Sequence, residues 1–208
     1  MRYDFPIVMP IVIDRIWRKV TMVWYKLRSP FLAWMWGVHY DKEVQFQGRT
    51  IIRTRRVGEI SLGEHVVFNS QALTNLVGLM GSNVLDTSGG GRIIVGDHSG
   101  FSSAVISSRS EIQIGCRVKV GGNVRIFDHD FHSVDAKIRC TPDDRLHIKT
   151  APVIIEDDVF VGTNCIIGKG VHIGLRSIIA AGSVVVKDVP ADEVWGGNPA
   201  TCIRRLHE

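Results

Sequence analysis

The sequence has few cysteines, and none of them stand in a C-x-x-C spacing. The four thiols lie far apart, at Cys116, Cys140, Cys165 and Cys202. This spacing argues against a zinc ribbon, and a chain of 208 residues is long enough to bury a core without disulfides. A hydrophobic fraction of 45% and a charged fraction of 22% are those of an ordinary folded protein. We therefore expect one main folded domain in a reducing, cytoplasmic compartment.

Long apolar runs are also missing near the start of the chain. The longest early uncharged run, residues 5–13, has nine residues, whereas a membrane-spanning helix needs about 20. No small-residue cleavage site follows this run, so the sequence predicts neither a spanning helix nor a signal peptide there. The glycine-rich segment TSGGGR at 87–92 lacks the G-x-x-x-x-G-K-[ST] spacing of a P-loop, and we interpret it as a flexible turn.

The body of the sequence lacks a basic stripe that could follow a nucleic acid. The net charge is +4, and residues 1–40 hold six basic and two acidic side chains. From totals of 25 basic and 21 acidic residues, the rest of the chain therefore carries 19 of each sign. The pI of about 9.0 thus comes from one short segment, and we expect no nucleic-acid partner.

That N-terminal segment, residues 1–40, predicts an amphipathic helix. Its apolar residues recur at three- and four-residue spacing and are Ile13, Ile16, Trp17, Val20, Trp24 and Leu27. Its basic residues fall largely on the other side and are Arg15, Arg18, Lys19 and Lys26. Pro10 favours a helix start and Ser29-Pro30 a helix end. Two interpretations remain open: the helix packs on the protein or on a neighbouring subunit, or it binds peripherally to the inner face of an anionic membrane.

The rest of the chain, residues 41–208, is built on a six-residue repeat. From residue 155 onward, branched apolar residues recur every six positions, at Ile155, Val161, Ile167, Ile173, Ile179 and Val185. Mostly small residues follow them. This period fits neither an α-helix nor an alternating hairpin. It predicts short strands separated by sharp turns, which stack as a solenoid.

An insertion interrupts the solenoid. The same register is present upstream at Ile114, Val120 and Ile126, and the step from Ile126 to Ile155 is 29 residues, which is not a multiple of six. We therefore predict a protruding loop over about residues 128–151. It opens with DHDFH, which places two aspartates and two histidines within five positions.

The segment IEDDVFVGTNCIIGKGVHIGLRSIIAAGSVVVKDVPADEVWGGNPATCIRRL resembles the C-terminal half of the hexapeptide-repeat acyltransferases. It is most similar to the galactoside, maltose and nodulation O-acetyltransferase branch, and the resemblance covers about residues 58–206. The combination of AAGSVVVKDVP with GGNPA is its most specific part. The resemblance implies an all-β fold, a left-handed parallel β-helix with three hexapeptides per coil, assembled as a homotrimer. It also implies that acetyl-CoA lies in the groove between adjacent β-helices.

The resemblance implies that His129 is the catalytic base. The family's catalytic histidine stands near the start of such a loop, in an H-x-x-H context that His132 completes. An imidazole can take the proton of a hydroxyl near neutral pH and return it to the departing thiolate. Asp128 or Asp130 would orient the ring, and the sequence leaves open which one does so. His132 has a structural role, an acceptor-contacting role or none, and without the resemblance both histidines would be interpreted as solvated loop residues.

A metal site is a separate hypothesis. The gamma carbonic anhydrases, another hexapeptide-repeat branch, hold a metal between three histidines. The spacing of His98, His129, His132 and His172 does not match that branch. The loop also lacks a helical periodicity that would place two histidines on one face. We therefore expect no metal.

Alignment with the family assigns contacts to the acceptor. The segment ISLGEHVVFN matches one whose asparagine binds the acceptor sugar, which points to Asn69. The alternative role of Asn69 is to cap a turn with its side chain. In VFVGTN, the backbone amide of Thr163 matches the family's oxyanion donor. Phe160 replaces a tryptophan that often lies beside the site.

Further positions match contacts to the coenzyme. Lys187 in VVKD and Arg204 in CIRRL match positions that approach its pantetheine and phosphate portions. Ala181 lies where the backbone meets the pantetheine amides. Thr201 stands where relatives usually carry Lys or Arg, and Arg205 is a candidate to compensate. The alternative for each basic residue is a solvated surface charge.

These features favour an acetyl-CoA-dependent O-acetyltransferase. It would transfer an acetyl group directly to a hydroxyl of a sugar or glycan precursor, as in surface-polysaccharide biosynthesis. Alternatives within the same class are an N-acetyltransferase on an amino sugar and an O-acetyltransferase on a foreign compound. From another class, the chain could be a non-catalytic solenoid that serves as an assembly platform. The sequence identifies neither the acceptor nor the length of the acyl group.

Overall fold

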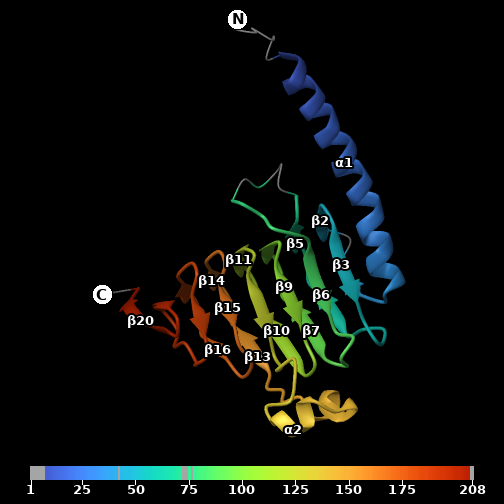
Figure 1. The fold of residues 1–208 in the computed structure, drawn as a ribbon. Helices are drawn as coiled ribbons and strands as arrows, with labels where there is room; N and C mark the ends of the chain where they lie inside the picture. Colours follow the sequence, from blue (N-terminus) through green and yellow to red (C-terminus); the bar gives the residue numbers. More distant parts are fainter. Residues whose placement is uncertain (1–7, 42, 72–74, 76, 207–208) are drawn as a thin grey trace, which may run out of the picture.

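The chain winds into a stack of coils, and one long N-terminal helix extends from the end of the stack that carries β2 and β3 (Figure 1). The computed structural model describes residues 8–41, 43–71, 75 and 77–206. Residues 1–7 of the predicted N-terminal segment therefore lie outside the described residues. Each coil contributes one short strand to each of three parallel sheets.

The three sheets are named A, B and C in the order in which each coil passes through them. Sheet A contains β1 (His39–Tyr40), β4 (Ile60–Leu62), β7 (Arg92–Val95), β10 (Glu111–Ile114), β13 (Val153–Ile155) and β16 (His172–Ile173). Sheet B contains β2 (Gln45–Gln47), β5 (Val67–Asn69), β8 (Gly100–Ser102), β11 (Lys119–Gly122), β14 (Phe160–Val161), β17 (Ile178–Ile179), β19 (Glu193–Gly197) and β20 (Ala200–Arg205). Sheet C contains β3 (Thr50–Arg53), β6 (Asn83–Asp86), β9 (Val105–Ser107), β12 (Arg125–Phe127), β15 (Ile166–Ile167) and β18 (Val184–Val185). We call the row of turns from sheet B to sheet C the B–C edge, and the row from sheet C to sheet A the C–A edge.

The six-residue repeat gives each coil its buried core. The predicted lead residues from Ile155 to Val185 are all at most 1% exposed, which confirms their inward direction. Equivalent residues of successive coils stack on each other, as Phe46, Phe68 and Phe101 do with ring centroids 5.5 and 5.0 Å apart. Because every inward side chain meets its counterpart one coil away, the solenoid has a continuous apolar interior. The antiparallel hairpin of β19 and β20 forms one end of sheet B.

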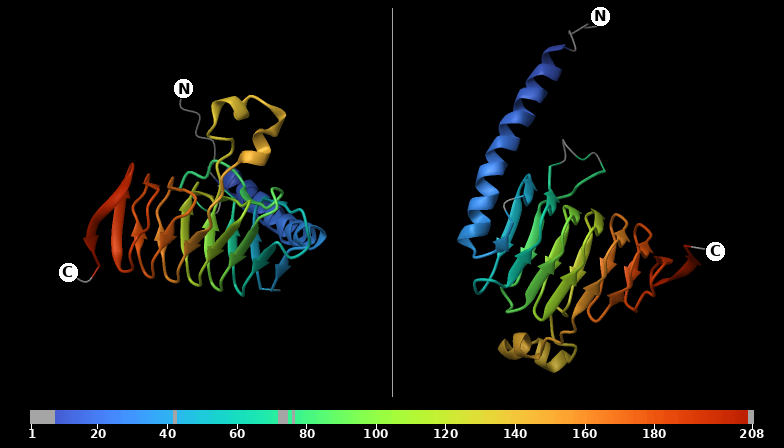
Figure 2. Two further views of the ribbon diagram at one scale, coloured as in Figure 1. Left: turned by 90° about the horizontal axis from the view of Figure 1, so that it is seen from below. Right: turned by 180° about the vertical axis from the view of Figure 1, so that it is seen from behind.

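The N-terminal helix α1 spans Val8–Met35 and projects away from the coils (Figures 1 and 2). The predicted end at Ser29-Pro30 is therefore wrong, because the helix continues through Pro30. A proline inside a helix costs about 3 kcal/mol, and contacts to the first coil offset that cost here. Ser29 Oγ donates to the carbonyl of Gly48 at 3.4 Å, and Tyr40 donates to the carbonyl of Pro30 at 3.0 Å. Within the described residues, neither α1 nor any other helix is long and apolar enough to cross a bilayer.

The predicted insertion protrudes from the C–A edge between β12 and β13 (Figure 2). It contains the short helix α2 (Ala136–Arg139) and the 3-10 turn η1 (Pro142–His147). The two arms of the insertion are joined at its base. Asp130 N donates to the carbonyl of Lys149 at 3.0 Å, and Ala151 N donates to that of Asp128 at 2.9 Å. These bonds return the chain to the next coil and fix the residues at the start of the insertion.

Candidate active site

His129 lies two residues after the end of β12, at the base of the insertion. It forms an antiparallel bridge with Thr150 and is 8% exposed. Its ring lies edge-on to that of Phe131, with centroids 4.7 Å apart. The backbone bridge and the aromatic contact hold the ring at the C–A edge.

The hydrogen bonds of His129 distinguish its two ring nitrogens. Nδ1 lies 2.9 Å from the carbonyl oxygen of Asp130. A carbonyl can only accept, so Nδ1 carries a hydrogen and Nε2 bears the lone pair of the neutral ring. Nε2 lies 3.2 Å from Ser107 Oγ. The ring therefore presents a basic nitrogen next to a hydroxyl group.

Ser107 and Asp86 extend this hydrogen-bonded group, and no sequence motif pointed to either residue. Ser107 Oγ donates to Asp86 Oδ2 at 3.4 Å. Both residues end strands of sheet C, and the strand pairs align Asp86 with Ser107 and Ser107 with Phe127. An alignment of successive coils on their inward-pointing residues would have revealed Asp86 and Ser107, because both occupy the same position in consecutive coils.

The structure separates the two aspartates proposed to orient His129. Asp128 is buried, and its carboxylate accepts from Ser108 Oγ at 2.6 Å and from the amides of Arg109 and Ser110 at 2.8 Å each. Those bonds tie the insertion to the preceding turn of the C–A edge. Asp130 contacts the His129 ring through its main-chain carbonyl. Its carboxylate binds Lys169 Nζ at 2.5 Å, and its buried Oδ2 has no hydrogen-bond partner among the described residues.

His132 faces the far part of the insertion. Its Nδ1 lies 2.6 Å from Asp144 Oδ2, and Ser133 N donates to the other oxygen of Asp144 at 2.7 Å. The hydrogen bond with His132 is the main cause of a lowered pKa at Asp144, followed by the bond from Ser133. The His132 side chain is 66% exposed. These contacts brace the insertion.

Three other predicted residues gather around the B–C edge. Asn69 ends β5, and its Oδ1 accepts from the amide of Gln71 at 3.0 Å. Thr163 stands in the turn between β14 and β15, where its Oγ1 donates to the carbonyl of Gly122 at 2.7 Å. Phe160 is 47% exposed and lines, with Asn69, a shallow hollow of about 280 Å³ on sheet B. Since the B–C and C–A edges are opposite ends of the sheet C strands, one copy of the chain does not bring these residues to His129.

The residues assigned to the coenzyme are exposed and lie on the last coils. Ala181 stands at the B–C edge between β17 and β18, whereas Lys187 follows β18 at the C–A edge. Arg204 and Arg205 lie on β20, and Arg205 Nε is 3.6 Å from a carboxylate oxygen of Glu193. Within one copy these residues are therefore spread over different sides of the solenoid. The described residues contain no group of three or more His, Cys, Asp or Glu that could hold a metal ion.

Comparisons with known proteins connect this geometry to a family. Residues 152–187 match the model for the hexapeptide repeat of succinyl-transferase. Residues 152–187 of this chain thus form a hexapeptide repeat. A hexapeptide-repeat-containing acetyltransferase from Vibrio cholerae has a similar structure, with 25% identity, a TM-score of 0.57, and coverage of 96% of this chain and 94% of that one. These findings confirm the predicted resemblance and the left-handed parallel β-helix.

Two further structures share the fold of this chain. A maltose O-acetyltransferase from Clostridium difficile is 23% identical, with a TM-score of 0.57 and coverage of 95% and 88% of the two chains. The N-acyltransferase AntD from Bacillus cereus, solved with dTDP and 3-hydroxybutyryl-CoA, is 18% identical, with a TM-score of 0.67 and coverage of 87% and 89%. At these identities the likeness concerns the fold alone.

The curated relatives match a shorter part of the chain. A 2,3,4,5-tetrahydropyridine-2,6-dicarboxylate N-acetyltransferase from Clostridium perfringens is 56% identical over 57 residues, which are 27% of this chain and 24% of the relative. The enzyme of that name from Staphylococcus aureus is 50% identical over 58 residues, 28% of this chain and 24% of the relative. The matches thus span about a quarter of the length of these relatives.

Proposed function

We propose that this chain is an acetyl-CoA-dependent acetyltransferase with His129 as its general base. The hydrogen bond between His129 Nδ1 and the Asp130 carbonyl carries the proposal, because it leaves Nε2 as the proton-accepting nitrogen. The similar Vibrio cholerae protein is named an acetyltransferase, and a second structure of it contains acetyl-CoA. The curated relatives are named N-acetyltransferases.

The proposed reaction is a direct transfer. Nε2 of His129 takes the proton of the acceptor hydroxyl while its oxygen attacks the thioester carbon. The bond from carbon to sulfur then breaks, and the imidazolium returns the proton to the CoA thiolate. The backbone amide of Thr163 would stabilise the oxyanion, since no hydrogen-bond partner for this amide is seen among the described residues.

The acceptor proposed here is a hydroxyl of a sugar or glycan precursor. Asn69 and Phe160 would contact it from the hollow on sheet B, which a sugar ring can enter because it is open and lined by both polar and aromatic groups. Transfer to an amine is the second candidate. The names of the curated relatives and of AntD support that alternative.

The site requires two copies of the chain. His129 lies at the C–A edge and Thr163 and Ala181 lie at the B–C edge, so we propose that the edges of neighbouring subunits in a homotrimer face each other. Lys187, Arg204 and Arg205 would hold the phosphates of the coenzyme. The apolar and basic helix α1 supports peripheral association with the inner face of an anionic membrane, where surface-polysaccharide precursors would be acetylated.

An assay of CoA release tests this function. Full-length protein is supplied with acetyl-CoA and a panel of saccharides and amino sugars, and the free thiol of CoA is measured. We expect His129→Gln to lower the rate about 10²- to 10⁴-fold, which is what a general base contributes. His147→Gln is the matched control, because His147 is an exposed histidine of the same insertion.

The outcome separates the alternatives. An unchanged rate in His129→Gln rules out the assigned base. Alkaline hydroxylamine cleaves an ester product and leaves an amide intact, which distinguishes O- from N-transfer. A chain that binds no CoA in calorimetry would be an assembly platform.

A further inference from the structure

A cavity of about 410 Å³ opens at the C–A edge, on the N-terminal side of His129. It lies against three successive turns of this edge, at residues 56–59, 90–92 and 110–111. Ser110 connects it to the candidate active site, because Ser110 N donates to Asp128, the residue before His129. The cavity and the histidine therefore share one short stretch of backbone, from Ser107 to Ser110.

Two arginines line this cavity, and two more lie against its glycine turn. Arg56 and Arg92 line it, and Arg55 and Arg109 lie on either side of its glycine turn. A Cβ added to Gly90 would lie 3.6 Å from Nη1 of Arg55. One added to Gly89 would lie 2.6 Å from Cγ of Arg109. The glycines of the turn TSGGGR, which has no phosphate-loop spacing, thus leave room for the side chains of Arg55 from the coil before and Arg109 from the coil after.

The charges of these arginines are weakly compensated. Among the described residues, Arg55, Arg56 and Arg109 have no carboxylate within 4.0 Å, and Arg92 reaches Glu111 only at 3.9 Å, where both side chains are well exposed. Arginines elsewhere on the coils are paired closely with carboxylates. Arg117 and Arg176 each bind an aspartate with an Nε to oxygen distance of 2.6 Å.

The carboxylate of Glu59 inside the cavity is already engaged. It accepts from the amide of Arg55 and from Thr87 Oγ1, both at 2.8 Å. Burial alone would raise the pKa of Glu59, but these bonds and the nearby charge of Arg56 lower it. Glu59 therefore fixes the turn that carries Arg55 and Arg56.

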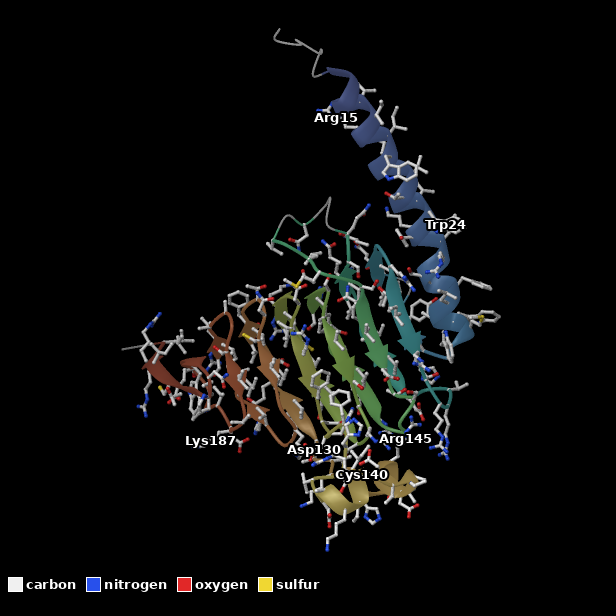
Figure 3. The ribbon with its side chains drawn as sticks, in the orientation of Figure 1. Arg15, Trp24, Asp130, Cys140, Arg145 and Lys187 are labelled. Atoms are coloured by element: carbon white, nitrogen blue, oxygen red, sulfur yellow. The ribbon has the colours of Figure 1, made fainter. Side chains whose placement is uncertain are left out.

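The insertion contacts the turn between β9 and β10, whose Ser110 lines the cavity. Arg109 Nη2 donates to the carbonyl of Arg145 at 3.4 Å, which joins the arginine turn to the insertion. Figure 3 shows Arg145 and Asp130 together at this edge, with Lys187 farther along it. Since the residues assigned to CoA lie on the last coils, the N-terminal side of His129 is left for the acceptor.

We propose that this cavity binds a phosphate or diphosphate group of the acceptor, through Arg55, Arg56, Arg92 and Arg109. A guanidinium group can donate two parallel hydrogen bonds to the oxygens of a phosphate. Four such groups can neutralise the charge of a diphosphate. This inference rests on the proposed function, because that function makes the bound ligand the acceptor of the acetyl group. It narrows the acceptor to a phosphorylated saccharide, whose phosphate would be attached to a nucleoside or to a lipid.

Calorimetry with inorganic pyrophosphate tests the site without any turnover. We expect full-length protein to bind pyrophosphate, and the double variant Arg56→Gln/Arg92→Gln to bind it at least tenfold more weakly. Arg49→Gln is the matched control, because Arg49 is an exposed arginine of the first coil at the opposite B–C edge. Circular dichroism and thermal melting verify that each variant is folded.

Two further binding measurements separate this cavity from the coenzyme site and from the catalytic base. Saturating CoA should leave pyrophosphate binding unchanged, and His129→Gln should bind pyrophosphate normally. Tighter binding of UDP than of pyrophosphate supports a nucleotide-linked acceptor, and tighter binding of farnesyl diphosphate supports a lipid-linked one. Absence of binding, equal binding by the double variant, or displacement by CoA each overturns the proposal. Failure of the CoA-release assay with intact pyrophosphate binding would instead reject the proposed function.

Discussion

The side chain of His129 is held by two neighbours of different chemistry, the carbonyl of Asp130 at 2.9 Å and the hydroxyl of Ser107 at 3.2 Å. The carbonyl can only accept, whereas the hydroxyl can donate or accept. When the ring is neutral, Ser107 can donate to Nε2. When the ring gains a proton, Nε2 can donate to Ser107, whose own hydrogen is then available to Asp86. The pair Ser107 and Asp86 therefore suits both protonation states of a general base.

Ser107→Ala should lower kcat about 10- to 100-fold, the effect of losing one hydrogen bond to a charged group. The KM for acetyl-CoA should stay within about twofold, because the hydroxyl supports the ring in the transition state and does not bind the coenzyme. Ser107→Thr keeps the hydroxyl and should restore most of kcat. Steady-state kinetics of both variants would show this split.

Ser61→Ala is the control for Ser107, since Ser61 is a strand serine of sheet A away from the insertion. A kcat of Ser107→Ala equal to that of the unmodified chain would mean that Ser107 only fills space beside the ring.

At the scale of elements, the helix α1 is unusual in how much apolar surface it exposes. Ile13, Trp17, Val20, Trp24 and Leu27 are 55–70% exposed. They lie on one face, and Ser29 and Ala33, which pack on the first coil, are buried. An exposed apolar face with basic residues on the helix fits an anionic lipid surface. The alternative is that neighbouring subunits cover this face.

Replacing both tryptophans, Trp17→Glu/Trp24→Glu, should weaken binding to vesicles that contain phosphatidylglycerol at least tenfold. Buried aromatic area and attraction to anionic lipid are lost together. Vesicle flotation measures this, with phosphatidylcholine vesicles as the neutral comparison. Substitution is preferable to deletion of residues 1–40, because deletion would uncover the coil beneath Ser29 and Ala33.

Met80→Glu is the control for the helix, since Met80 is 83% exposed on a loop of the solenoid. If the unmodified chain also stays unbound to anionic vesicles, α1 is not a membrane anchor and its apolar face belongs to a subunit contact.

For the whole molecule, the separation of the two edges is the decisive feature. His129 and the arginine cavity lie at the C–A edge, and Thr163 and Ala181 lie at the B–C edge. The strands of sheet C stand between them, and one rigid solenoid cannot fold back on itself. With the proposed site residues, we therefore expect a complete site to need two copies.

Mixing two inactive variants tests this assembly. His129→Gln removes the base at one edge, and Ala181→Trp blocks the other edge. In a trimer assembled at random from equal amounts, about one quarter of the sites would pair two intact edges. Activity should recover to that level after co-refolding, as measured by CoA release. Tagged copies would verify that mixed oligomers form, and mixed oligomers without any activity would contradict a shared site.

Much of the architecture could be predicted because the repeat is a local property of the chain. Six residues per strand and turn determine which side chains point inward, and Ile155 to Val185 follow that pattern without exception. The insertion was predictable because 29 residues between Ile126 and Ile155 break the repeat. His129 was found by its resemblance to a family motif at that break.

The sequence by itself determined the solenoid and the place of the insertion, because both follow from spacing along the chain, and its resemblance to a family supplied the β-helix and the candidate base. Only the tertiary structure decided which groups meet His129. Ser107 reaches it from 22 positions earlier in the sequence, and Asp86, 43 positions before His129, reaches Ser107, because strand pairing brings those coils into register. Tertiary contacts also explain why α1 continues through Pro30, because contacts with the first coil offset the free-energy cost of a proline inside a helix. Spacing along the chain cannot report such contacts, since they depend on how the coils stack.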